Sequence, residues 1–173
     1  MTFFGDLWAL LATLALTASQ RAVLFAIVAA VTAVLSVPAV RTLIQSRGLP
    51  RRSTPEASAR GRAAGRRYAA VVAVEFVAVF VVANLLGSAG LTPFIPPVVA
   101  LIVGLHFLPL AAIFGVRAYY LTGALISLVA VAAVALLLGV TPDDPFGPSF
   151  VVGLGTAAVL WATAFVLLRA VGR

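Results

Sequence analysis

Two ionisable side chains, Glu75 and His106, lie inside long apolar stretches of this sequence. Burying such a group at depth in a bilayer costs about 2.5–3.5 kcal/mol on insertion scales, so it faces protein or water and commonly marks a functional site. Desolvation favours the neutral form of each group, whereas proximity favours the ion pair. The two residues therefore have the chemistry of a ligand, ion or proton site, or of a contact that only fixes the register of two helices.

The depths of these two residues are similar. Glu75 lies eight residues after Arg67, and His106 lies eleven residues before Arg117, which correspond to about 12 Å and about 16 Å along a helix. Because eleven residues is almost three turns, His106 and Arg117 share a helix face. Trp161 has a comparable depth. The sequence predicts a polar pocket lined by Glu75, His106, Arg117 and Trp161.

The stretch around His106 is the most unusual in the chain. Pro109 cannot donate a hydrogen bond to the carbonyl of Leu105, which leaves an acceptor beside His106. Gly104 allows a neighbouring helix to approach closely. We therefore expect this segment to carry the chemistry of the fourth apolar stretch.

Residues 104–109 have the pattern G-x-H-F-x-P, and an R-x-Y stretch follows from Arg117 to Gly123. In these two motifs the chain resembles a group of small uncharacterised bacterial multi-span membrane proteins. The resemblance covers residues 104–123. It implies a helical bundle without known activity, and it favours His106 and Arg117 acting as a unit.

Catalytic signatures are missing from the sequence. It contains no H-E-x-x-H, no G-x-S-x-G, no phosphate loop and no dinucleotide motif. It has no Cys and a single His, too few ligands for an ordinary metal site. We expect no catalytic residue, no metal and no cofactor, and an enzyme would need further polar groups converging on His106.

The composition indicates a membrane protein. Hydrophobic residues make up 63% of the 173 residues and charged residues only 10%. On the apolar set that adds Gly and omits Tyr the share is about 69%, against a typical 45–50% for soluble domains. So large an apolar excess excludes an ordinary soluble domain, because it would leave large apolar patches exposed to water. Such a surface is stable only where lipid surrounds the protein.

The sequence predicts an all-α polytopic transmembrane helical bundle of three helical hairpins. The six expected spans cover about 3–19, 22–40, 68–86, 94–115, 118–140 and 150–168. The first is expected to be short or tilted because Asp6 interrupts it, so five spans are the alternative. A cleaved signal peptide is a competing interpretation of that stretch, although it lacks a positive n-region.

Positive charge predicts the orientation. Residues 41–67 hold eight Arg and one Glu. The net charge of this segment is therefore +7, the same as the net charge of the whole chain. Arg in short loops stays on the cytoplasmic side, so this segment is expected to be a basic cytoplasmic loop. Only Arg21 disagrees with this orientation. With six spans both termini are expected to be cytoplasmic, and with five the N-terminus lies outside. The expected localisation is a bacterial cytoplasmic membrane.

The basic loop is expected to lie on anionic lipid at the cytoplasmic face of the bilayer, through Arg47, Arg51, Arg52, Arg60, Arg62, Arg66 and Arg67. A nucleic-acid partner is not expected, because no aromatic interleaving or nucleic-acid fold signature accompanies the charge. Bundles of this size often assemble further, as a homo-oligomer or with a partner membrane protein.

The function that these features favour is binding or transport of a small molecule or ion through the intramembrane polar pocket. The alternative is a non-catalytic membrane scaffold or accessory subunit whose basic loop docks lipid or a partner. A cavity that both Glu75 and His106 face would favour the first, and a tightly packed, dry interior would favour the second.

Overall fold

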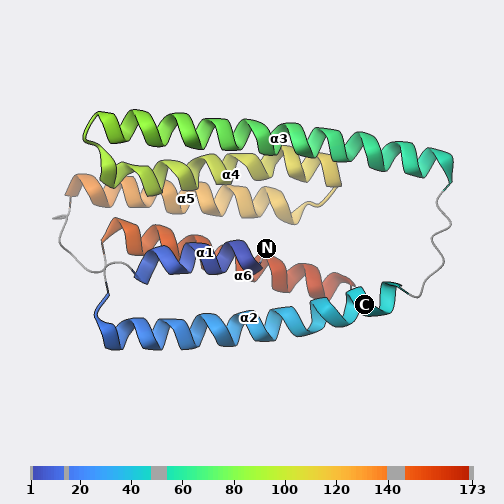
Figure 1. The fold of residues 1–173 in the computed structure, drawn as a ribbon, viewed down its shortest axis with the longest axis horizontal. Coiled ribbons are helices and arrows are strands. Elements are labelled where there is room, and N and C mark those ends of the chain that lie inside the picture. The colour runs from blue at the N-terminus through green and yellow to red at the C-terminus, as the bar shows by residue number, and fades with distance from the viewer. Residues whose placement is uncertain (1, 14–15, 48–53, 140–146, 172–173) are drawn as a thin grey trace.

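Every regular element in the described part of the chain is a helix, which confirms the all-α prediction. The computed structural model describes residues 2–13, 16–47, 54–139 and 147–171. Its elements are α1 (Thr2–Ala12), α2 (Ala18–Arg47), α3 (Pro55–Ser88), the 3-10 helix η2 (Thr92–Phe94), α4 (Ile95–Phe114), α5 (Ala118–Gly139) and α6 (Pro148–Val171) (Figure 1). Five helices, α2 to α6, are long and apolar enough to cross a membrane, so the chain has the architecture of a multi-pass membrane protein.

The first helix is short. With 11 residues, α1 is about 16 Å long, roughly half of the 30 Å hydrocarbon core of a bilayer. The chain turns at Thr17, whose backbone N–H donates to the side chain of Gln20, and this contact caps the start of α2. The predicted span 3–19 is therefore a half-length helix followed by a turn, and the helix lengths match the five-span alternative.

The third helix begins well before the predicted span. The side chain of Thr54 accepts a hydrogen bond from the N–H of Ala57, Pro55 occupies the first helical position, and Glu56 lies in the first turn. These signals, followed by Ala and Arg with high helix propensity, make α3 a helix of 34 residues. Much of the predicted 41–67 loop is thus helical, because α2 also continues to Arg47; residues 48–53 lie outside the described part.

The core lies between α1, α4, α5 and α6. Its large buried side chains include Trp8, Phe107, Ile126 and Leu160, one from each of these helices. Helices that follow one another in the chain run antiparallel, whereas α2 and α6 run parallel, and α2 and α3 lie at the two outer sides (Figure 1). Of the expected hairpins, α3–α4 and α5–α6 pack closely, whereas α1 packs mainly on α6 and only lightly on α2.

A close helix contact, which we call the seam, lies between α4 and α5. A Cβ atom added at Gly104 would lie 2.9 Å from the backbone nitrogen of Ser127, and one added at Gly123 would lie 2.6 Å from the carbonyl oxygen of Gly104. Small residues at such positions let helix backbones approach within van der Waals contact, which is the main source of helix association in lipid.

We expect Gly104→Ala to lower the free energy of unfolding by about 1–3 kcal/mol, because the added methyl group must push α5 away from α4. The measurement is thermal or denaturant unfolding in detergent micelles, followed by circular dichroism. The matched control is Gly87→Ala in α3, where an added Cβ meets no atom within 4 Å. That variant is expected to gain about 0.5–1 kcal/mol. Equal stability of the two variants would contradict the claim that close packing at Gly104 holds α4 against α5.

Candidate functional site

Glu75 and His106 meet at the interface of α3 and α4. The His106 Nδ1 atom lies 2.6 Å from the Glu75 Oε2 atom, and the side chains are 12% and 18% exposed. Within the described residues Nδ1 makes no aligned hydrogen bond, so the contact is close but does not have the direction of a ring N–H donor. The pairing that the two depths predict is therefore present as a direct contact between the charged or chargeable atoms.

The seam between α4 and α5 explains why His106 faces α3. Gly104 faces α5, and a residue two positions further along a helix points about 200° away from it. On α3, Glu75 lies seven residues after Tyr68, so both share the face toward α4. The ring of Tyr68 packs on that of Phe114 with centroids 5.9 Å apart. Two contacts thus fix the register of α3 on α4.

The surroundings of the pair are apolar. The ring of Phe107 lies edge-on to that of His106, with 5.6 Å between centroids. On the outer side of α3, Val74 and Phe76 are 69% and 71% exposed in the isolated chain, as expected for side chains that face lipid. The Glu75–His106 pair therefore lies at the edge of the bundle, covered by its own two helices.

The other two residues of the predicted pocket lie elsewhere. Arg117 is exposed in the turn between α4 and α5, and within the described part of the chain it forms no ion pair. Trp161 contacts neither Glu75 nor His106 through any hydrogen bond or ring contact found among the described residues; its indole N–H instead donates to Asp6 Oδ1 at 3.2 Å. The structure brings together two of the four predicted residues.

A second polar cluster joins α1, α2 and α6. Asp6 Oδ1 accepts hydrogen bonds from the indole N–H of Trp161 and, at 2.8 Å, from the hydroxyl of Thr32. A Cβ atom at Gly5 would lie 2.6 Å from Trp161 Nε1, so only glycine lets the indole lie so close to α1. This cluster was not predicted from the sequence. Its signal is Asp6 itself, a carboxylate that interrupts an apolar stretch and needs donors from neighbouring helices.

Polar side chains also lie inside the bundle at a similar depth. The hydroxyls of Thr122 and Thr163 are 2.7 Å apart between α5 and α6. Thr156 is fully buried, and its hydroxyl has no partner among the described residues. Following the antiparallel contacts from helix to helix places the Glu75–His106 pair and the Asp6 cluster within about one or two turns of the same depth.

Most of the basic residues lie at one end of the bundle, and Arg21, in the first turn of α2, lies at the other end (Figure 1). Arg60, Arg62, Arg66 and Arg67 are exposed on the first half of α3, and Arg47 ends α2, while Arg51 and Arg52 lie outside the described residues. The start of α3, the α4–α5 turn and the end of α6 lie on the same side (Figure 1). Among the described residues, no group of three or more His, Cys, Asp or Glu could hold a metal ion.

Comparison with protein-family models, with curated proteins and with solved structures finds no match to this chain. The fold and the site define a class, a multi-pass α-helical membrane protein with an ionisable pair between two of its spans. Its function has to be inferred from the geometry of its own residues.

We expect Asp6→Ala to lower the free energy of unfolding by about 1–3 kcal/mol, because it leaves the Trp161 N–H and the Thr32 hydroxyl without their acceptor. Asp6→Asn keeps a carbonyl oxygen at the same place and is expected to lose less. Unfolding in detergent, followed by Trp fluorescence, measures both. Identical losses in the two variants would show that the acceptor is not what holds α1 to α2 and α6.

Proposed function

We propose that this membrane protein binds and releases a proton at the Glu75–His106 pair while it binds or moves a small molecule or ion across the bilayer. The single observation that carries the proposal is the 2.6 Å contact between a carboxylate oxygen and an imidazole nitrogen in the apolar part of two spans. Ionisable residues at such depth are costly and mark ion and proton pathways in membrane proteins.

The charge states of the pair explain why one proton is held there. With one proton shared, the pair is neutral overall, either as carboxylic acid and imidazole or as carboxylate and imidazolium. Adding or removing a proton leaves a net charge in an apolar setting, which is unfavourable unless another charge compensates it. Release of the proton is therefore linked to arrival of a cation, and uptake to its departure.

The size of the contact limits what the pair can hold. A separation of 2.6 Å leaves no room between the two atoms for anything larger than a proton. A larger ligand needs the two side chains to separate. Because α3 packs mainly on α4 and η2 and none of its residues is fully buried, this movement would disturb little else.

The alternative, a non-catalytic scaffold or accessory subunit, is favoured by one observation. No residue of α3 is fully buried, and its outer side carries exposed large residues such as Phe76 and Phe80. Either lipid or a helix of another membrane protein, or of a second copy, can cover such a surface. In that role the Glu75–His106 contact would fix the register of α3 and would not exchange protons.

The infrared spectrum of the protein in vesicles tests proton binding. We expect a band of a protonated carboxylic acid that changes with pH, disappears in Glu75→Gln and shifts in His106→Gln, because the imidazole perturbs the carboxyl group that it touches. The matched control is Glu56→Gln in the exposed first turn of the same helix, which should leave this band unchanged. If no pH-dependent band is lost in Glu75→Gln, the pair is structural and the accessory role stands.

We also infer that the basic end of the bundle faces the cytoplasm of a bacterial cell, with the end of α6 on that side, the half-length α1 pointing its first residues toward it, and most of the basic residues near anionic lipid. The asymmetry of Arg supports this orientation, since Arg60 to Arg67, Arg117 and Arg169 lie toward one end. Because α1 runs antiparallel to α6, its first residues point toward the same end (Figure 1).

Single cysteines test the orientation cleanly, because the chain has no Cys of its own. We expect Ala59→Cys, near the start of α3, to react with a membrane-impermeant thiol reagent only after cells are opened. Ser88→Cys, at the other end of α3, should react in intact cells whose outer envelope is permeabilised. The reverse pattern would mean that the Arg-rich end lies outside and that the positive charge does not set the topology.

A further inference from the structure

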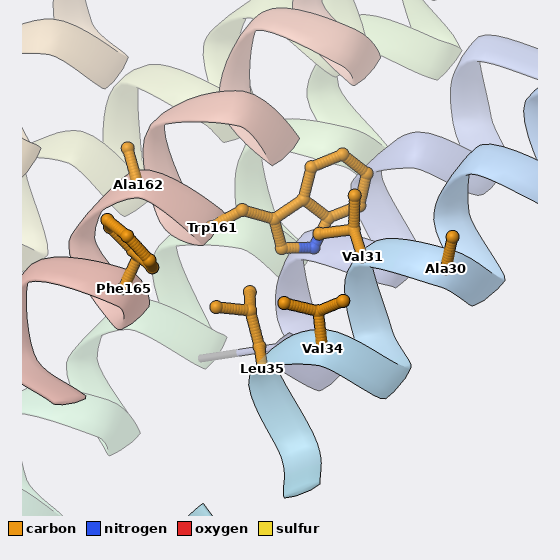
Figure 2. Close-up of a pocket in the computed structure, with 7 residues that line it drawn as sticks. All are labelled: Ala30, Val31, Val34, Leu35, Trp161, Ala162 and Phe165. Carbon is orange, nitrogen blue, oxygen red and sulfur yellow. The ribbon is translucent and has the colours of Figure 1, made fainter. Parts of the chain in front are cut away.

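An open apolar groove of about 380 Å³ runs between α2 and α6, away from the Glu75–His106 pair. Figure 2 shows its lining, which comes from two helices only: Ala30, Val31, Val34, Leu35, Trp161, Ala162 and Phe165. The volume is within the usual range of ligand sites in proteins. No lining side chain carries a charge, so an occupant of the groove itself has to be apolar.

The groove covers part of one leaflet. From Ala30 to Leu35 the rise along α2 is about 8 Å, and Arg41 lies about 9 Å further along the helix. The groove and the segment up to Arg41 together cover about 16 Å, close to the hydrocarbon half-thickness of about 15 Å. The deep end lies beside Trp161, where the indole reaches Asp6, and the groove continues from there toward the basic end of the bundle.

Two Arg residues lie at the shallow end. The guanidinium of Arg169 stacks on the ring of Phe165, with 4.2 Å to the ring centroid, so it sits directly on the wall of the groove. On α2, Arg41 is exposed and lies seven residues after Val34, which places it on the groove side of that helix.

The two Arg residues also share a level. Asp6 bonds both Thr32 and Trp161, which aligns these two positions of α2 and α6. Arg41 lies nine residues after Thr32 on α2, and Arg169 lies eight residues after Trp161 on α6. Both Arg residues therefore lie about 12–14 Å beyond the aligned pair. Within the described residues neither of these Arg side chains forms an ion pair.

We propose that the groove is a binding site for one anionic phospholipid of the leaflet at the basic end. One acyl chain lies along Val34, Phe165 and Trp161, and the phosphate lies between Arg41 and Arg169. Charge complementarity selects this occupant, because an apolar groove with two guanidinium groups beyond its shallow end matches an acyl chain joined to an anion. The site does not depend on proton binding at Glu75.

The fluorescence of Trp161 reports on the groove. The chain has two Trp residues, so Trp8→Phe leaves Trp161 as the reporter. In vesicles containing lipids brominated about 12 Å below the headgroup, the depth of Trp161 below Arg169, an acyl chain in the groove quenches its emission. We expect brominated phosphatidylglycerol to quench more strongly than brominated phosphatidylcholine at the same mole fraction, which gives a relative association constant above one.

Variants separate the charge from the groove. In this background, Arg41→Gln and Arg169→Gln are each expected to lower the preference for phosphatidylglycerol roughly five-fold, and the double change should abolish it. Arg21→Gln, which removes the same charge at the opposite end of α2, should leave the preference intact. Ala162→Phe fills the groove and should reduce quenching by both lipids, whereas Ala132→Phe on the exposed side of α5 should not.

Three results would overturn the proposal. Equal quenching by the two lipids would show that the headgroup is not recognised. A preference that survives the double Arg variant would place the recognition elsewhere. No quenching by either lipid would mean that the groove is closed to lipid, and dimerisation measured in the same vesicles would then identify a second copy as its occupant. Circular dichroism of each variant confirms that the helices are retained.

Discussion

The close approach of α4 and α5 at Gly104 and Gly123 determines what α4 presents to its other neighbours. With one side of α4 held against α5 at backbone contact, Phe107 is directed into the core and His106 toward α3. The seam thus fixes the rotation of α4 about its own axis. A rotation of α4 by one residue would turn His106 toward lipid, where an imidazole has no partner, so the packing of two glycines and the placement of an ionisable group are one constraint.

A second constraint acts on every span, because the bilayer offers no water to polar side chains. The structure meets it by pairing polar groups between helices. Asp6 takes two donors from α2 and α6, and Thr122 meets Thr163 across α5 and α6. These contacts lie at a similar depth, so they hold the helices at one level while the apolar residues above and below supply packing. The exceptions among the described residues are the Thr156 hydroxyl and the His106 Nδ1 atom, which touches Glu75 without an aligned hydrogen bond.

The sequence predicts the depth of each residue well and its direction around the helix poorly. Glu75 and His106 have similar distances from flanking Arg residues, and a short turn joins their helices, so their contact follows from one-dimensional reasoning. Trp161 has the right depth but lies on a helix whose neighbours cannot be derived from chain order, since α6 packs on α1 and α5. The packing of α1 on α6 is determined by tertiary contacts, such as that between Gly153 and Trp8, and not by the order of the helices in the chain. The ends of helices can be predicted from their capping residues. The Thr54 cap marks the start of α3, and this start was missed because the high Arg content of the segment was interpreted as a loop.

The length of α3 has a mechanical consequence. At 34 residues it is about 51 Å long, so about 20 Å of straight, Arg-bearing helix extends beyond the 30 Å that the hydrocarbon core covers. Since α4 is the main packing partner of α3 along the span, the charged end of α3 has the geometry of a long arm whose support lies in the membrane. A sideways force on the charged arm, from lipid or from a bound macromolecule, becomes a change in tilt. The distance between Glu75 and His106 is the coordinate that such a tilt would alter first.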